Sequence, residues 1–142
     1  MGLDQFAKAV RGEMTIIGEG YDSYEKYEFE YSLSDWRKHP NLQGWMQNLW
    51  ESRGKKPDNE RCEYVGCVKM TDGQFNGVEV ELSLADLDLL EADIIHADLP
   101  RTSGFFFGEN SDERYKEQDL EFVQDARVAI ADGYTVIYDS SW

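Results

Sequence analysis

The sequence predicts an α+β fold: a mixed, mostly antiparallel sheet of four or five strands with about three helices packed mainly on one face. Residues 78–82 alternate apolar and acidic side chains, as a strand with one buried face does. Residues 84–97 and 113–132 carry apolar side chains at helical spacing, so each segment has one face to bury. At this length we expect residues 1–142 to form a single domain.

The first third of the chain is expected to hold a short helix at 3–10 and two strands. Residues 14–17 form a short apolar run that ends in glycine, and residues 27–33 alternate aromatic or leucine side chains with glutamate and serine. We therefore predict strands at both places, the second with one apolar face.

A helix is predicted at 41–53. Ser34 or Asp35 could cap the segment that leads into it, Pro40 would set its start or kink it, and Gly54 would close it. Its apolar stripe consists of Leu42, Trp45, Met46, Leu49 and Trp50.

The middle of the chain is predicted to be a hairpin followed by a helix. Strands at 63–70 and 77–82 would flank an Asp-Gly turn at 71–74. Ser83 and Asp86 have the spacing of a capping box, so the next helix starts at about residue 84. Its predicted inward stripe consists of Leu84, Leu87, Leu90, Ile94 and Ala97.

The last third is predicted to hold a long helix at 113–132 and a final strand at 134–138, with Gly133 between them as a C-cap. Its inward positions would be Leu120, Phe122, Val123, Ala126 and Ile130. Before this helix, the aromatic run 105–107 is either a buried strand or plug, or an exposed aromatic patch.

The net charge of −15 is unevenly distributed. Residues 1–71 hold 12 acidic and 10 basic side chains, whereas residues 72–142 hold 17 acidic and 4 basic ones. Such a field repels nucleic acids and anionic membranes and favours basic partners. No apolar run is long enough to span a bilayer, and the N-terminus lacks the pattern of a signal peptide, so we expect a cytoplasmic protein.

No sequence motif for an enzyme, a cofactor or a metal stands out. The chain has no phosphate-binding glycine loop, nucleophile elbow, CxxC or HExxH motif, so we expect no catalytic residues, no cofactor and no metal site, and lean against an enzyme. Cys62 and Cys67 could join His39 and His96 as zinc ligands, but small buried thiols suit their spacing better. His96, near a helix end, fits a capping role.

Two surface hypotheses remain. In the first, the acidic half binds a basic protein, with the carboxylates imitating part of the charge array of DNA; the alternative is that this charge serves solubility or salt adaptation. The helix side of this surface would be Asp86, Asp88, Glu91, Asp93 and Asp98, continued by Glu113, Glu117 and Asp119, with Glu109, Asp112, Glu121 and Asp125 as further candidates.

In the second hypothesis, Arg37 and Lys38 hold an anionic small molecule near a helix start, with Trp36 stacking on it and Asn76 nearby. The site would belong to a small-molecule-binding protein or a small enzyme. The alternative is that Trp36 packs in the core while Arg37 and Lys38 balance neighbouring acids.

Several motifs in combination resemble a family of small uncharacterised proteins of bacteriophages and prophages. They are the opening MGLD, WRKHPNLQGWM, FNGVEVEL, GFFFG, KEQDL and the final SSW, and the likeness covers nearly the whole chain. Members are sometimes labelled phosphoglycerate kinase, but this chain is far too short for a two-domain kinase and has no recognisable nucleotide site.

The resemblance implies a phage accessory protein that acts in the cytoplasm of the host bacterium. Together with the acidic C-terminal half, it leads us to expect a non-enzymatic protein that binds a basic host protein. It brings no catalytic residues. The shared motifs fall mainly on positions that we expect in the core and turns, and their polar members are Arg37, Lys38, Asn76, Glu117, Gln118 and Asp119. If a ligand site exists, these polar side chains should converge on it.

Overall fold

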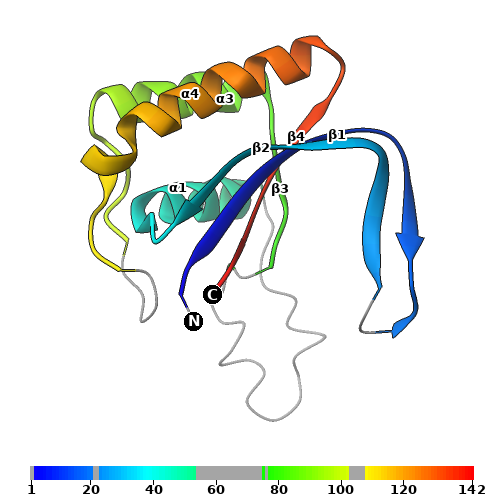
Figure 1. The fold of residues 1–142 in the computed structure, drawn as a ribbon. Coiled ribbons are helices and arrows are strands. Elements are labelled where there is room, and N and C mark those ends of the chain that lie inside the picture. Colours follow the sequence, from blue (N-terminus) through cyan, green and yellow to red (C-terminus); the bar gives the residue numbers. More distant parts are fainter. Residues whose placement is uncertain (1, 21–22, 54–74, 76, 103–107) are drawn as a thin grey trace.

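The computed structural model describes residues 2–20, 23–53, 75, 77–102 and 108–142. Within these residues four strands form one antiparallel sheet in the order β2-β1-β4-β3, together with three helices (Figure 1). The elements are β1 (Asp4–Ile17), β2 (Tyr24–Arg37), α1 (Pro40–Ser52), β3 (Val80–Leu82), α3 (Leu84–Ile95), α4 (Asp112–Ala131) and β4 (Thr135–Ser141). The predicted α+β class is confirmed.

Strand β1 replaces the short helix that the sequence suggested at 3–10, and that expectation is wrong. Leu3, Gln5, Ala7 and Ala9 are buried, whereas the intervening Phe6 is 48% exposed. This alternation is that of a strand with one covered face. Alanine and glutamine are weak strand formers, but here β1 pairs with β2 on one side and β4 on the other, and the sheet overrides local propensity.

Helices α3 and α4 lie side by side over one face of the sheet (Figure 1). The core between them and the strands includes Leu87 and Leu90 of α3 and Phe122 of α4, all at most 1% exposed. Phe122 meets the Trp36 ring of β2 edge to face at 5.1 Å. Helix α1 joins this layer through Trp45, whose indole NH donates to Asp93 of α3 at 2.8 Å.

The start of α3 is as predicted and its end is not. Ser83 Oγ accepts from the Asp86 amide, and the Asp86 carboxylate accepts from the Ser83 amide, which completes the capping box. The helix ends at Ile95, before the expected residue 97, because Ala97 adopts a left-handed φ of 57°. Leu84 is 50% exposed, so the buried stripe starts at Leu87.

Helix α1 begins at Pro40 as expected, but its N-cap is His39. Ser34 and Asp35 do not cap it, since β2 continues to Arg37 and holds both residues in the sheet. They instead accept hydrogen bonds from the Gln118 side chain of α4. The long helix α4 therefore contacts the end of β2 directly.

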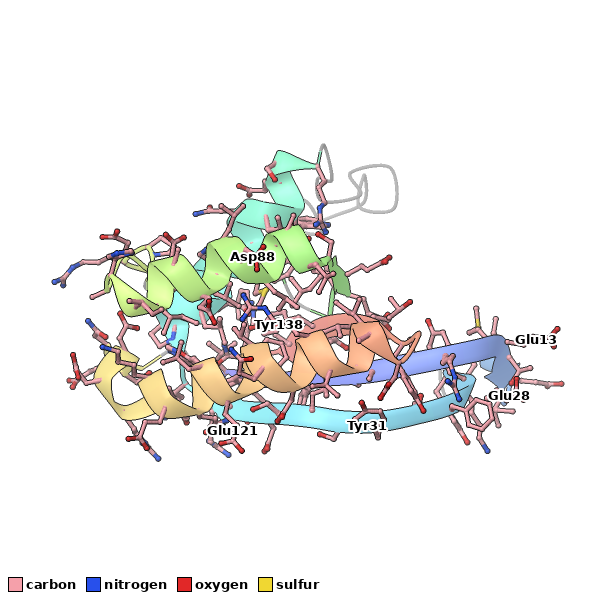
Figure 2. The ribbon with its side chains drawn as sticks, turned by 90° about the horizontal axis from the view of Figure 1, so that it is seen from above. Glu13, Glu28, Tyr31, Asp88, Glu121 and Tyr138 are labelled. Carbon is pink, nitrogen blue, oxygen red and sulfur yellow. The ribbon has the colours of Figure 1, made fainter. Side chains whose placement is uncertain are left out.

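The outer halves of β1 and β2 form a two-stranded arm that bends away from the helices (Figure 1). Pairing of β1 with β4 stops at Val10, and the β1–β2 register shifts after Arg11, next to Gly12 at φ +89°. A side chain at Gly12 would meet Glu28. Glu13 and Glu28 lie far from the helices (Figure 2), and Phe29, the neighbour of Glu28 in β2, is 46% exposed.

Several expectations fall outside the described residues: the strand at 63–70, its turn at 71–74, Asn76, the two cysteines and the aromatic run 105–107. In the part of the chain that the structure describes, no helix combines the length and the apolar character that crossing a membrane requires.

Candidate functional site

A buried carboxylate connects β2, α1 and α4. One oxygen of Asp119 accepts from the Trp36 indole NH at 2.8 Å, and the other lies 2.7 Å from His39 Nε2. The side chains of His39 and Asp119 are 0% and 2% exposed. Burial raises the pKa of the Asp119 carboxyl, and the hydrogen bonds from His39 and Trp36 oppose that rise.

A second set of buried polar side chains extends from His39 toward β4. The Gln5 side chain accepts from the His39 amide and donates to both the His39 carbonyl and the Tyr138 hydroxyl. Tyr138 in turn donates to Gln43 of α1, whose amide group donates to Ser140. Burial raises the pKa of Tyr138, which lies beneath α3 and α4 (Figure 2). The turn around His39 is thus fixed from inside the core.

The end of β2 and the turn that leads into α1 face outward at Arg37 and Lys38 and inward at His39. Lys38 has a φ of 55°, an uncommon value for a residue other than glycine. Two bonds hold it there: its amide donates to Leu3 O at 2.8 Å, and the Ser111 hydroxyl donates to its carbonyl at 3.0 Å. The backbone therefore fixes where the two basic side chains leave the surface.

A pocket of about 460 Å³ opens beside this turn, at the N-terminus of α4. Its basic lining residues are Arg37 and Lys38 from the turn and Arg114 from α4, and its other lining residues are Gly108, Glu109, Asn110 and Ser111. A side chain at Gly108 would approach the Lys38 stem within 3.1 Å, so glycine lets this loop lie against the lysine. The pocket is formed by segments far apart in sequence.

The pocket is positively charged although the protein is acidic. Three of the ten lysine and arginine residues in the described part of the chain line it, against one lining carboxylate, Glu109. Arg37 also lies 3.8 Å from Asp4, a distance between exposed groups that leaves the guanidinium largely available. The N-terminus of α4 adds positive potential, which Asp112 and Glu113 in its first turn reduce.

The structure brings together only part of the ligand site that the sequence suggested. Arg37 and Lys38 line one pocket. Trp36 is buried in the core, with its indole NH bonded to Asp119, and does not line the pocket, so it is not placed to stack on a ligand there. Asn76 lies outside the described residues.

The predicted acidic surface divides into three groups. Asp86 and Asp119 are buried, and Asp93 is half-buried with a bond from Trp45; these carboxylates serve the fold. Asp88 and Glu91 both bind Arg127 of α4 at 2.7 Å. The exposed remainder is Asp98, Glu109, Glu113 and Glu117, joined on α4 by Glu121 and Asp125.

The pKa shifts of these groups agree with the division. Burial raises the pKa of Asp86, but the bonds from Ser83 and Arg53 outweigh it, so the pKa lies below its ordinary value. The hydrogen bond from Arg127 lowers the pKa of Glu91, and the same pairing raises the pKa of Arg127. Arg53 and Arg127 therefore balance part of the negative charge of Asp86, Asp88 and Glu91.

Sequence reasoning missed Ser111, Asn110 and Arg114, because nothing in the chain before α4 marks them as neighbours of the β2–α1 turn. One signal was present for Asp119: it stands three positions before Phe122 and four before Val123, on the inward face of the helix. Among the described residues, no cluster of three histidine, cysteine or carboxylate side chains could hold a metal ion.

No family model, curated protein or solved structure matches this chain.

Proposed function

We propose that this protein binds an anionic small molecule in the pocket lined by Arg37, Lys38 and Arg114. The observation that supports the proposal is the convergence of these three basic side chains on one concavity in a protein of net charge −15. Scattered over the surface, the same charges would neutralise neighbouring acids. Gathered around a pocket, they attract an anion from solution.

The size of the pocket suits a ligand larger than a bare ion. Its volume of about 460 Å³ lies within the range of small-molecule sites, roughly 300–1,000 Å³. Two guanidinium groups favour planar or tetrahedral oxyanions, which they bind through paired hydrogen bonds. We therefore expect a phosphorylated or carboxylated compound, with its polar remainder against Asn110 and Ser111.

Sulfate and a phosphate monoester should both bind, and charge removal in the pocket should weaken them. We expect Arg37→Gln and Arg114→Gln each to weaken binding about tenfold, the effect of losing one charge-assisted hydrogen bond. Isothermal titration calorimetry at low salt measures the dissociation constants.

The matched control is Lys116→Gln, which removes one exposed positive charge from the same helix outside this pocket. It should change affinity less than twofold or so, because exposed charges at a distance are screened. If all three variants lost the same amount of anion affinity, net charge alone would explain the loss, and the proposed site would be contradicted.

A second surface supports the other function considered from the sequence. Glu113, Glu117, Glu121 and Asp125 are exposed and follow one another every fourth residue along α4. Successive members lie about 6 Å apart along the helix axis. Glu121 extends from the side of α4 away from α3 (Figure 2). We call these four residues the acidic row.

We propose the acidic row as a docking surface for a basic protein, and the phage resemblance would make that partner a protein of the host bacterium. The acidic row is smaller than the acidic surface predicted from the sequence. Asp86, Asp93 and Asp119 form hydrogen bonds within the fold and are not available to another protein. Binding would depend on charge and weaken steeply with salt.

Affinity capture from bacterial lysate tests the row. A variant with Glu113, Glu117 and Glu121 changed to Gln and Asp125 changed to Asn should lose a basic partner that the wild type retains at low salt and releases at high salt. Its control changes Glu13, Glu19, Glu28 and Glu30 to Gln, which removes the same charge from exposed positions of the arm and its tip. Loss of the partner in both variants would argue against a specific row.

A further inference from the structure

A chain of hydrogen bonds leads from the basic pocket into the core. Ser111, which lines the pocket, places its Oγ 3.3 Å from Nδ1 of His39. The other nitrogen of His39 lies 2.7 Å from Asp119, whose second oxygen accepts from Trp36. The pocket wall is therefore connected, through one imidazole, to a buried carboxylate.

The same three residue types form the triad of serine hydrolases, but burial argues against that role here. In a nucleophilic triad the histidine passes its proton to the leaving group, so the ring must be reachable from the substrate. The His39 side chain has no exposed surface. A leaving group in the pocket could contact Ser111 but not the imidazole.

The hydrogen of Ser111 has two acceptors, and the charge of His39 decides between them. With neutral His39, Nδ1 has a free lone pair and competes for the hydroxyl hydrogen with the Lys38 carbonyl, 3.0 Å away. With protonated His39, Nδ1 becomes a donor to Ser111 Oγ. The hydroxyl must then donate elsewhere, to Lys38 or to an anion in the pocket.

Two carboxylates and one aromatic ring of α4 face the His39 ring. From α4, Asp119 lies at 2.7 Å and Asp112 Oδ1 at 3.9 Å from its ring nitrogens, while Tyr115 stacks on the ring at 4.9 Å. The Asp112 oxygen is buried without a hydrogen-bond partner among the described atoms. From β1, Gln5 forms hydrogen bonds with the backbone of His39, and from β2, the Trp36 indole NH donates to Asp119.

We propose that His39 is a positioning residue for the anion in this pocket and acts through Ser111, so that anion binding and protonation of the imidazole favour each other. The proposal rests on the proposed small-molecule site. An anion gains a hydroxyl donor when His39 is protonated, because Ser111 then no longer donates to Nδ1. By linkage, the bound anion makes protonation easier by the same factor.

The sign of the pH dependence follows. Histidine changes charge between about pH 5 and pH 8, so anion affinity should rise as pH falls through this range. We expect binding about tenfold tighter at about pH 5.5 than at about pH 8, within the usual range of coupling between two sites. Calorimetry in buffers of different ionisation enthalpy should detect uptake of a fraction of a proton.

The probe is sulfate, because it keeps its charge across this range whereas phosphate changes its own. Ser111→Ala should reduce affinity at about pH 5.5 to near the value at about pH 8 and remove the proton uptake. Ser111→Thr keeps a hydroxyl and should retain both. The control His96→Gln removes an exposed histidine at the C-cap of α3 and should behave as wild type.

These variants also separate His39 from Glu109, the carboxylate in the pocket wall, whose protonation would favour anions too. Glu109 is unchanged in Ser111→Ala, so a pH profile that survives this substitution overturns the inference. If sulfate binds without proton uptake, the inference about His39 is also overturned, but the anion site remains supported. If sulfate does not bind at any pH, the site itself fails. Labelling of Ser111 by a fluorophosphonate would show it to be a nucleophile and overturn the positioning role.

Discussion

Replacement of Asp119 with alanine should lower the free energy of unfolding by about 3–5 kcal/mol, because it removes the shared partner of two buried hydrogen-bonding groups. The carboxylate accepts from Trp36 and lies against His39, and its side chain is 2% exposed. Without it, the buried imidazole and the buried indole NH each lose a hydrogen-bond partner. Urea denaturation followed by tryptophan fluorescence measures the loss.

Glu117→Ala is the matched control, since it removes a carboxylate from an exposed position of the same helix. Its effect should stay within about 0.5 kcal/mol, as for most surface substitutions. Asp119→Asn, which keeps the shape and one acceptor, should fall between the two. If Asp119→Ala were as stable as Glu117→Ala, the buried network could not be holding α4 to the turn before α1.

Gly44→Ala should destabilise the protein by about 2–3 kcal/mol, although alanine is the better helix former by about 1 kcal/mol. Helix α1 passes so close to Thr102 that a side chain at Gly44 would overlap Thr102 Oγ1 and lie 2.9 Å from its Cβ. Thr102 cannot easily withdraw, because its amide donates to Asn41 of the same helix at 3.0 Å. Thermal unfolding of the variant shows the loss.

Asn48→Ala, at an exposed position of α1, provides the comparison and should be neutral or slightly stabilising. Adding Thr102→Gly to Gly44→Ala should recover part of the lost stability, and a double-mutant cycle gives the coupling between the two positions. If the stability changes of the two substitutions simply add, then contact with Thr102 is not the reason that position 44 requires glycine.

The sequence was most informative where a pattern is local. The capping box of Ser83 and Asp86 placed the start of α3, and the stripe around Trp45 and Trp50 placed α1, because both signals depend on neighbours within one or two turns. Strand β1 was not predicted, because its buried positions Gln5, Ala7 and Ala9 do not show the alternation of large apolar and polar side chains that indicates a strand. Their burial depends on β2 and β4 on either side.

The candidate site was predictable only in part for the same reason. Arg37 and Lys38 are adjacent, so their clustering is visible in the chain, whereas Ser111 reaches Lys38 across 73 positions. Asp119 looked like one more member of an acidic surface, yet its side chain is buried and lies 2.7 Å from His39 Nε2. The number of acidic residues does not show which carboxylates face solvent. Nor does it show which of them form hydrogen bonds with a buried group that water cannot reach.

The neighbouring places of β1 and β4 in the sheet have a consequence for how the chain folds. Gln5 and Tyr138, which bond each other in the core, are 133 positions apart. Such contacts make folding slow, since most of the chain must be ordered before they form. During synthesis the β1–β2 hairpin can form early, but the other edge of β1 has no strand to pair with until β4 has left the ribosome. Until then that edge is open to other strands, so we expect nascent or truncated chains to be the species most prone to aggregation.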